Sequence, residues 1–333
     1  MSINNEETQK ISEEINSLIQ NVSSMIFIDR LKLEFLIAAK IAGGHVILAD
    51  SHGVGKTSLA KALAQSIDWS GSEFSIQNIS IETFNRIQCT VDLLPQDIIG
   101  FSRYEPTTGK LAFNRGPIFA HFVLCDEINL LTPKTQGSFF QAMEELSISI
   151  EGITYHLPNN FFIISTMNLK GAHLFPLPVP QLDRFMIRLS FGYPSELDET
   201  SIIKQHGTDN SWEGFKAVVP HSMVNNWRKS VDHVFIHDDI ISYIVNLIRK
   251  TRNHPAIEIG ASPRSGIKLS RLARALALVR GHNWVSADLI KEIFIASMAH
   301  RIVMRDPSLI SDEILIEILN STPIDNKTKH SKD

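Results

Sequence analysis

Asp50-Ser51-His52-Gly53-Val54-Gly55-Lys56-Thr57 is the stretch of sequence that decides the fold of this chain. It follows the apolar run 45–49, which predicts a buried strand, and it precedes residues 58–64, which predict a helix. A glycine-rich turn between a strand and a helix is the setting of a phosphate-binding loop. The stretch therefore predicts nucleotide binding by an α/β fold and leaves the reaction open.

The residues of this loop are the candidates for holding the nucleotide. Gly53 and Gly55 allow the backbone to turn its amides toward a triphosphate. Lys56 can reach the outer phosphates, and the hydroxyl of Thr57 can ligate Mg²⁺. The first position of the GxxxxGK[ST] pattern is Asp50, and aspartate tolerates left-handed turn geometry better than most residues. The predicted contacts are Ser51, His52, Gly53, Val54, Gly55, Lys56, Thr57 and Ser58.

The composition is that of a soluble globular protein with two domains. The chain has 333 residues, of which 43% are hydrophobic and 20% charged, and no apolar run reaches the ~18 residues of a membrane span. The net charge of −4 disfavours a constitutive nucleic-acid binder. The polar start, residues 1–10, is unlike a signal peptide, and Cys89 and Cys125 lie in apolar segments, as expected of buried free thiols. We therefore expect a cytoplasmic protein.

Two patterns divide the chain. Between residues 44 and 194, apolar strand-like runs alternate with helical stretches, which predicts a three-layer α/β core with a mainly parallel sheet. From Pro194 onward the pattern is helical, and it ends in a polar tail that we expect to be disordered. The expected strands are 45–49, 76–81, 122–125, 161–166 and 185–191, and the expected later helices are 196–206, 238–252, 264–280, 286–303 and 311–319.

A second motif, residues 122–127, is an apolar strand that ends in two acids. Asp126 would hold the metal, directly or through water, and Glu127 would orient and deprotonate the attacking water. An acidic pair that merely caps a strand end is the alternative, but the upstream loop favours the catalytic interpretation.

Three further polar residues are candidates for the same site. Asn168 follows another buried strand and could help to place the water, or it could be an ordinary turn residue. Arg184 is suited to stabilise a transferring phosphoryl group, and the alternative is a surface ion pair with Asp183. Ser262-Pro263 predicts a capped helix start, which would place Arg264 on the first turn, either facing an interdomain cleft or simply exposed.

In their order and spacing, these motifs resemble the AAA+ ATPases and, in detail, the MoxR subfamily. The resemblance runs from about residue 26 to 305 and includes the aspartate at the first loop position. It is carried by Gly43-Gly44-His45-Val46, Arg86-Ile87-Gln88-Cys89-Thr90, Asp92-Leu93-Leu94-Pro95, Asp97-Ile98-Ile99-Gly100, Gly116-Pro117-Ile118-Phe119, Asp126-Glu127-Ile128-Asn129, Pro133-Lys134-Thr135-Gln136, Leu177-Pro178, Gln181-Leu182-Asp183-Arg184-Phe185, Gly260-Ala261-Ser262-Pro263-Arg264 and His300-Arg301-Ile302.

The resemblance implies a role for each candidate. Asn168 takes the sensor-1 role, Arg264 takes the sensor-2 role in cis, and Arg184 looks like an arginine finger that acts on nucleotide held by the neighbouring subunit. Members of the family form rings, typically hexamers, and act as chaperone-like ATPases, commonly beside proteins with von Willebrand factor A domains. We therefore expect ATP and Mg²⁺ as cofactors, a homo-oligomeric ring, a protein client or von Willebrand factor A partner, and no nucleic acid.

The resemblance also implies a domain organisation. Within the core we expect an insertion in the second helix at about 78–115, with a hairpin near Thr107-Thr108-Gly109-Lys110. A second hairpin is expected at about 147–158, where Glu151-Gly152 predicts a tight turn. The expected parts are an N-terminal helical extension 1–25, an AAA+ core 26–194, a helical lid 195–320 and a tail 321–333.

Three positions depart from the family pattern. His52 replaces the usual proline, which should leave the loop less rigid. Leu130 stands where the family generally has arginine, and Phe27-Ile28 replaces a Val-Gly pair that commonly touches adenine. None of these changes removes a catalytic group.

The expected function is ATP hydrolysis that drives remodelling of a bound protein. The first alternative is a nucleotide-dependent assembly switch or scaffold with little turnover, and the second is a DNA helicase or loader, which the fold alone supports. A GTPase is disfavoured because Asn168-Leu169-Lys170-Gly171 lacks the aspartate that reads guanine.

Overall fold

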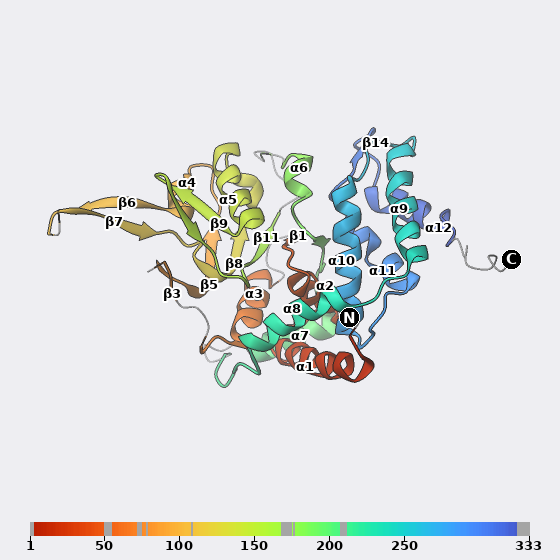
Figure 1. Cartoon of the computed structure of the whole chain (residues 1–333), viewed down its shortest axis with the longest axis horizontal. Helices are drawn as coiled ribbons and strands as arrows, with labels where there is room; N and C mark the ends of the chain where they lie inside the picture. The colour runs from red at the N-terminus through yellow and green to blue at the C-terminus, as the bar shows by residue number, and fades with distance from the viewer. Residues whose placement is uncertain are drawn as a thin grey trace.

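The protein consists of an α/β body and a helical unit that lie side by side (Figure 1). No helix within the described part of the chain is long and apolar enough to cross a membrane. The computed structural model describes residues 3–49, 55–71, 75–77, 79–107, 109–167, 175, 177–206 and 212–324.

A five-stranded parallel sheet forms the centre of the α/β body. Its strands lie in the order β12-β1-β11-β8-β5, so that β1 and β8 flank β11. Parallel strands with helices on both faces are buried on both sides, which explains the continuous apolar runs in the sequence. The strands are β1 (Val46–Leu48), β5 (Glu82–Gln88), β8 (Ala120–Asp126), β11 (Phe162–Thr166) and β12 (Ile187–Leu189).

The second strand of the sheet is not where the apolar pattern predicted it. The run 76–81 was expected to be a core strand, but it contributes only to a small antiparallel pair, β3 (Ser75–Ile76) with β4 (Ile79–Ser80). Its place in the sheet is taken by β5, which pairs with β8 and forms the edge. An edge strand is buried less completely, and β5 is accordingly rich in polar residues that a search for apolar runs passes over.

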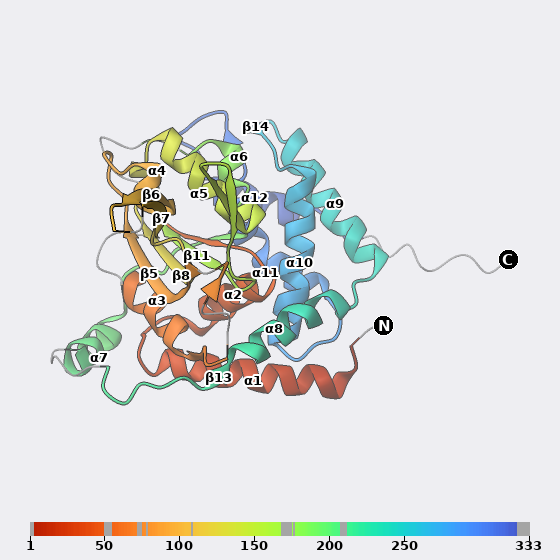
Figure 2. The same ribbon diagram turned by 60° about the vertical axis from the view of Figure 1, so that its left-hand side comes forward.

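The three-layer prediction is confirmed. Alternate residues of β8 enter two different apolar cores: Phe122 and Leu124 join one core, and Val123 and Cys125 join the other. The first core includes α2 (Arg30–Ile41) and α3 (Lys56–Gln65), whereas the second includes α5 (Pro133–Glu145). The helices therefore cover opposite faces of the sheet (Figures 1 and 2).

Two hairpins extend from the α/β body. β6 (Gly100–Glu105) and β7 (Lys110–Arg115) follow the short helix α4 (Pro95–Ile99) and project from the body (Figure 1). The expected insertion at 78–115 therefore contains strand β5 of the central sheet as well as this hairpin. β9 (Ser147–Ile150) and β10 (Ile153–His156) are joined through Glu151 and Gly152, whose φ angles of 51° and 81° are those of a tight hairpin turn.

The second half of the chain is mainly helical but also contains short strands. The five helices predicted there are present, and α8 is an additional one that buries only Val224, Trp227 and Ser230. The expectation of helices alone is wrong in detail, because β13 (Val219–Pro220) pairs with β2 (Ile67–Asp68) of the α/β body and β14 (Ile257–Ile259) pairs with β15 (Val303–Met304). The helices are α7 (Glu196–His206), α8 (His221–Ser230), α9 (Asp238–Asn253), α10 (Pro263–Val279), α11 (Ala287–Met298) and α12 (Ser311–Asn320).

The N-terminal helix, α1 (Asn5–Ser23), connects the two parts of the molecule. The hydroxyl of Ser12 donates to the carbonyl of Val279 at the end of α10, and the side-chain amide of Asn21 donates to Ser66 after α3. Helix α1 is thus packed against both the helical unit and the α/β body (Figure 2).

Candidate active site

The phosphate-binding loop joins β1 to α3, as the sequence predicted. Gly55 precedes the helix with φ 77° and ψ 16°, a left-handed conformation that favours glycine. No side chain within the described residues caps the first turn of α3, and such a helix N-terminus is a position at which anions bind. Lys56 is the first residue of α3, followed by Thr57 and Ser58, while the predicted contacts Ser51, His52, Gly53 and Val54 lie outside the described residues.

Three strands end beside one another at this edge of the sheet. Leu48, the last residue of β1, pairs with Thr166, the last residue of β11, and β11 lies next to β8, which ends at Asp126. The chain enters the phosphate-binding loop after β1 and reaches Glu127 after β8. Parallel sheets bind their ligands at the carboxyl ends of the strands, so the loop and the acidic pair belong to one site. Asn168 follows β11 in sequence and lies outside the described residues.

Asp126 is buried, and both of its carboxylate oxygens have partners. Arg86 on β5 places its Nε 2.6 Å from Oδ2, and the hydroxyl of Thr166 donates to Oδ1 at 3.3 Å. A charge-assisted bond of this length fixes the orientation of the carboxylate. No role for Arg86 or Thr166 was predicted from the sequence. A charged residue inside a strand and a threonine at the end of a buried strand were the features that could have indicated partners of Asp126.

Glu127 leaves the strand in a strained conformation. Its φ of 59° and ψ of 51° are left-handed, which is uncommon for a residue other than glycine. Its amide donates to the hydroxyl of Thr166 at 2.9 Å, so this hydroxyl contacts both acidic residues. Strained backbone of this kind persists only where surrounding contacts hold it, and it concentrates at functional sites.

The oxygen donors at this edge fit Mg²⁺ bound together with phosphate. The Asp126 carboxylate and the Thr57 hydroxyl are hard oxygen ligands, and magnesium usually takes one or two protein ligands besides water and phosphate oxygens. The described residues contain no cluster of three or more acids, histidines or cysteines that could form a cage for an ion. This donor set therefore suits a metal that arrives with the nucleotide.

A pocket of about 390 Å³ opens beside the phosphate-binding loop. Gly55 and Leu59 at the start of α3 line one side, and the Phe27-Ile28 pair lines another. Tyr193, between β12 and α7, and Asp198 of α7 complete the rim. The pair that departs from the family pattern thus supplies flat apolar surface next to the loop, where a planar base could lie.

Arg184 and Arg264 meet on one carboxylate. Nη2 of Arg184 lies 3.4 Å from Oε2 of Glu144, and Nη1 of Arg264 lies 2.8 Å from Oε1 of the same side chain. Arg184 also lies over the ring of Phe140, 5.4 Å from its centroid. Because Glu144 is far from both arginines in sequence, no local pattern could have predicted it.

These two arginines lie at the end of the sheet opposite to the phosphate-binding loop. Arg184 precedes β12, whose residue Ile187 pairs with Val46 at the start of β1, whereas the loop follows the end of β1. Arg264 shares the position of Arg184 through Glu144. The structure thus brings the two arginines together and keeps both away from Lys56. This separation does not fit the expectation that Arg264 acts on nucleotide bound to its own subunit.

A buried ion pair fixes the backbone that carries Arg184. Arg301 is 1% exposed, and its Nε lies 3.0 Å from Oδ1 of Asp183, while its Nη2 donates to the carbonyl of Phe185. Asp183 therefore pairs with Arg301 and not with Arg184, and the alternative of an Asp183–Arg184 surface pair is wrong. Burial lowers the pKa of Arg301 to about 10, and the charge of Asp183 opposes that shift.

Lys268 on α10 links the same backbone to the helical unit. Its ammonium donates to the carbonyl of Arg184 at 2.8 Å and also to the carbonyl of Asp183. Burial, together with the charge of Arg301, lowers the pKa of Lys268 to about 7. Ser262 and Ser265 at the start of α10 donate to the Asp183 carboxylate, so the first turns of α10 are attached to this segment.

Comparison with known proteins identifies the family. Residues 45–187 match the ATPase family associated with various cellular activities (AAA), and residues 249–318 match the AAA lid domain. The chain is 36% identical over 293 residues to YeaC of Bacillus subtilis, covering 86% of this chain and 88% of that protein. It is 31% identical over 297 residues to chaperone MoxR1 of Mycobacterium tuberculosis, covering 86% and 74%. The chain belongs to the MoxR family of AAA+ ATPases.

The MoxR fold is also found among solved structures. A crystal structure of a candidate ATPase from Cytophaga hutchinsonii superposes with a TM-score of 0.85 at 27% identity, covering 96% of this chain and 97% of that one. The AAA match spans β1, β8 and β11, the three strands whose carboxyl ends meet beside the predicted phosphate-binding loop. Leu130, one of the three positions expected to depart from the family pattern, is half-buried against the apolar core on the α5 side.

Proposed function

We propose that this MoxR-family protein hydrolyses ATP with Mg²⁺ in a homo-oligomeric ring and uses the cycle to remodel or activate a partner protein. Lys56 binds the outer phosphates, and Thr57 and Asp126 hold the metal, which neutralises developing charge when bound. Glu127 takes the proton of the attacking water, and Asn168 orients that water. The convergence of β1, β8 and β11 at one edge of the sheet supports these roles.

The observation that carries the proposal is the separation of the arginines from the phosphate-binding loop. Arg184 and Arg264 flank Glu144 at the far end of the sheet from Lys56. Charge stabilisation at the phosphate needs a cation in contact with it. Both arginines therefore act on nucleotide held by a neighbouring copy, and the sensor-2 arginine works in trans together with the finger.

The assembly and partner follow from the family. A head-to-tail contact between identical subunits closes into a ring when its rotation permits, and a hexamer is the proposed closure. The name of the MoxR1 relative, a chaperone, supports a protein client. A von Willebrand factor A domain protein is the proposed partner, and the free buried thiols Cys89 and Cys125 suit a cytoplasmic location.

We also propose where the domains divide. The AAA+ core begins near residue 26, after the α1 extension. β13 pairs with β2, and α8 packs on α2, so we assign residues 195–230 to the core with which they pack. The lid that moves is then residues 231–320. The tail from residue 325 lies outside the described residues.

Subunit mixing tests a site shared between copies. Lys56→Ala destroys the phosphate site of its own subunit, and Arg184→Ala removes the finger offered to the neighbour, so each variant alone should be inactive. An equal mixture should recover about a quarter of wild-type turnover, because that share of the contacts pairs an intact loop with an intact arginine. The Lys56→Ala/Arg184→Ala double variant, mixed with either single variant, provides the control.

Two results would contradict the proposal. Mixed rings that form, as judged by light scattering, but recover no activity would show that Arg184 does not act in trans. Wild-type turnover that stays near zero at every protein concentration would favour the switch or scaffold instead.

A further inference from the structure

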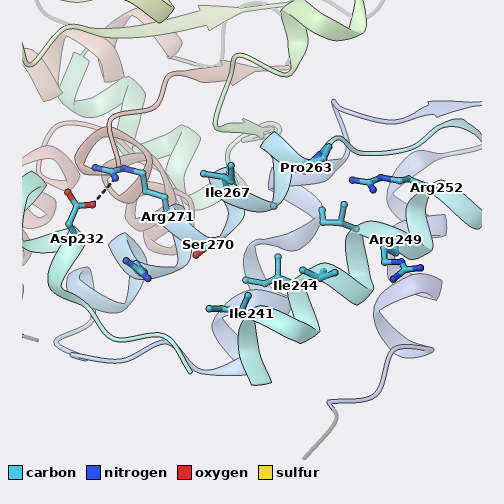
Figure 3. A pocket seen from close by; sticks show the side chains of 13 residues that line it. Asp232, Ile241, Ile244, Arg249, Arg252, Pro263, Ile267, Ser270 and Arg271 are labelled. Carbon is cyan, nitrogen blue, oxygen red and sulfur yellow. Dashed lines mark hydrogen bonds and ion pairs between the residues drawn. The ribbon is translucent and has the colours of Figure 1, made fainter. Parts of the chain in front are cut away.

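A groove of about 810 Å³ lies on the helical unit between α9 and α10. Ile241 and Ile244 of α9 and Ile267 of α10 face it (Figure 3). Ile267 is 70% exposed and Val245 is 47% exposed, although both are aliphatic. Exposed apolar surface gathered in a groove marks a binding site more often than scattered apolar residues do.

The groove has a strongly basic border. Four arginines line it, Arg249, Arg252, Arg271 and Arg274, whereas one lining residue, Asp232, is acidic and already pairs with Arg271. Arg249 and Arg274 have no carboxylate partner among the residues that the structure describes. An occupant should therefore combine apolar side chains with acidic ones.

Helix α7 carries such a surface on the other side of the same chain. Leu197 is 81% exposed and Ile203 is 72% exposed. Glu196 and Glu199 are exposed on the same face as Ile203, since positions 196, 199 and 203 recur at helical spacing, whereas Leu197 lies about a third of a turn away. Figure 2 shows α7 and α9 at opposite sides of the molecule, so the two surfaces cannot meet within one copy.

The groove and α7 lie next to the two halves of the shared site. Pro263, which lines the groove, is the neighbour of Arg264 on the first turn of α10. Asp198 of α7 lines the pocket beside Gly55 at the phosphate-binding loop. When Arg264 of one subunit reaches the phosphate-binding loop of the next, the groove of the first subunit comes close to α7 of the second.

We propose that the groove between α9 and α10 receives helix α7 of a neighbouring copy. The contact rests on the proposed function, because it follows from arginines that act in trans. Ile203 enters the apolar floor, and Glu196 and Glu199 on the same face of α7 meet the arginine border. The contact is head-to-tail, since the groove and α7 are different surfaces of one chain.

The lining of the groove disfavours a nucleic acid. Single strands bind through aromatic platforms on which bases stack, and the floor here is aliphatic, with no aromatic residue among those lining it. A second copy is favoured over an unrelated acidic partner because α7 supplies both required features within this chain.

Cross-linking between copies tests the contact directly. In the Ile203→Cys/Ile267→Cys double variant, a short bis-maleimide should produce a ladder of covalent oligomers in the presence of ATP, since each copy can link to two others. A mixture of the two single variants should stop at dimers. Cys89 and Cys125 are buried and should not react. The matched control is Ile203→Cys/Ile316→Cys, because Ile316 is also exposed but lies outside the groove.

Charge exchange provides a second test. Arg249→Glu, and separately Glu196→Arg/Glu199→Arg, should each raise the protein concentration of half-maximal assembly about tenfold. The combined variant should return to within about threefold of the wild type, because opposite charges again face each other. Arg305→Glu, an exposed reversal outside the groove, should change nothing.

The outcomes separate this proposal from the proposed function. Rings that form and hydrolyse ATP without the ladder, or without recovery in the combined variant, overturn the α7 contact and leave the shared site intact. A ladder that is equally strong in the control pair also overturns it. A wild-type protein that neither assembles nor cross-links overturns both.

Discussion

Arg86 and Asp126 form an ion pair between two neighbouring strands of the sheet, with Nε of Arg86 2.6 Å from Oδ2 of Asp126. The acid ends the buried strand β8, and the arginine reaches it from the edge strand β5. Arg86 thereby orients a carboxylate that we assign to the metal without itself touching the nucleotide. Partners that orient a metal ligand commonly change metal affinity by 10- to 100-fold when removed.

Arg86→Ala should weaken the response to magnesium. The Asp126 carboxylate would lose its charged partner and its fixed orientation, so the Mg²⁺ concentration for half-maximal ATP hydrolysis should rise about tenfold. For Arg86→Lys, the Mg²⁺ concentration for half-maximal hydrolysis should lie between those of the wild type and Arg86→Ala, because lysine keeps the charge but not the geometry of arginine. Arg103→Ala on the exposed β6 hairpin is the control, and an unchanged magnesium titration in Arg86→Ala would refute the positioning role.

Glu127→Gln should bind ATP normally but hydrolyse it at least about a hundredfold more slowly, since glutamine cannot accept the proton of the attacking water. Binding is measured with a fluorescent nucleotide and hydrolysis by phosphate release. Glu145→Gln at the exposed end of α5 is the matched control. Wild-type turnover in Glu127→Gln would exclude this residue as the base.

Arg301→Met should destabilise the protein by about 3–5 kcal/mol, because it leaves the carboxylate of Asp183 without its buried partner. The Asp183→Asn/Arg301→Met variant should recover part of that loss, since no unpaired charge remains. The free energy of unfolding is measured in urea. Arg305→Met, a change at an exposed residue before α12, should shift the free energy of unfolding by less than about 0.5 kcal/mol. An equally small shift in Arg301→Met would contradict the prediction.

Lys40 should make stability depend on pH. It is buried over the ring of Phe122, and burial, with the charge of Arg228, lowers its pKa from 10.5 to about 7. Below pH 7 both states carry the proton, and the native state bears the full cost of a buried charge. Between pH 7 and 10.5 the unfolded state binds more protons, so the free energy of unfolding should rise with pH.

Lys40→Met should therefore stabilise the protein most below pH 7, with an advantage over the wild type that shrinks as the pH rises toward 10.5. Urea unfolding at several pH values measures the difference. Lys10→Met on the exposed face of α1 should show no such trend. An advantage that is constant with pH would mean that Lys40 is not charged differently in the two states.

The parts of the site that the sequence predicted are those encoded within a short segment. The turn after β1 requires Gly55, and the two acids directly follow a buried strand, so local pattern was sufficient for both. Glu144 could not be predicted, because it meets Arg264 only when α5 and α10 come together. Thr166 and Arg86 reach Asp126 from other strands for the same reason.

The fold was predictable where burial is complete and not where it is partial. β1, β8 and β11 are buried on both faces and read as apolar runs. β5 lies at the edge and is mostly polar, so the apolar run 76–81 before it was predicted to be the core strand instead. Helix α8 is polar overall and buries only Val224, Trp227 and Ser230, so it was not predicted from apolar residues, although it packs against α2.

The attachment of Lys268 to the backbone of Arg184 means that the finger we propose is not carried by a freely moving loop. A client that pulls on the helical unit would strain this link through α10 and shift Arg184 relative to the phosphate it serves. If the proposed ring and its shared site hold, the rate of hydrolysis in the neighbouring subunit would depend on this resistance, and a subunit working against a well-folded client would slow the next one.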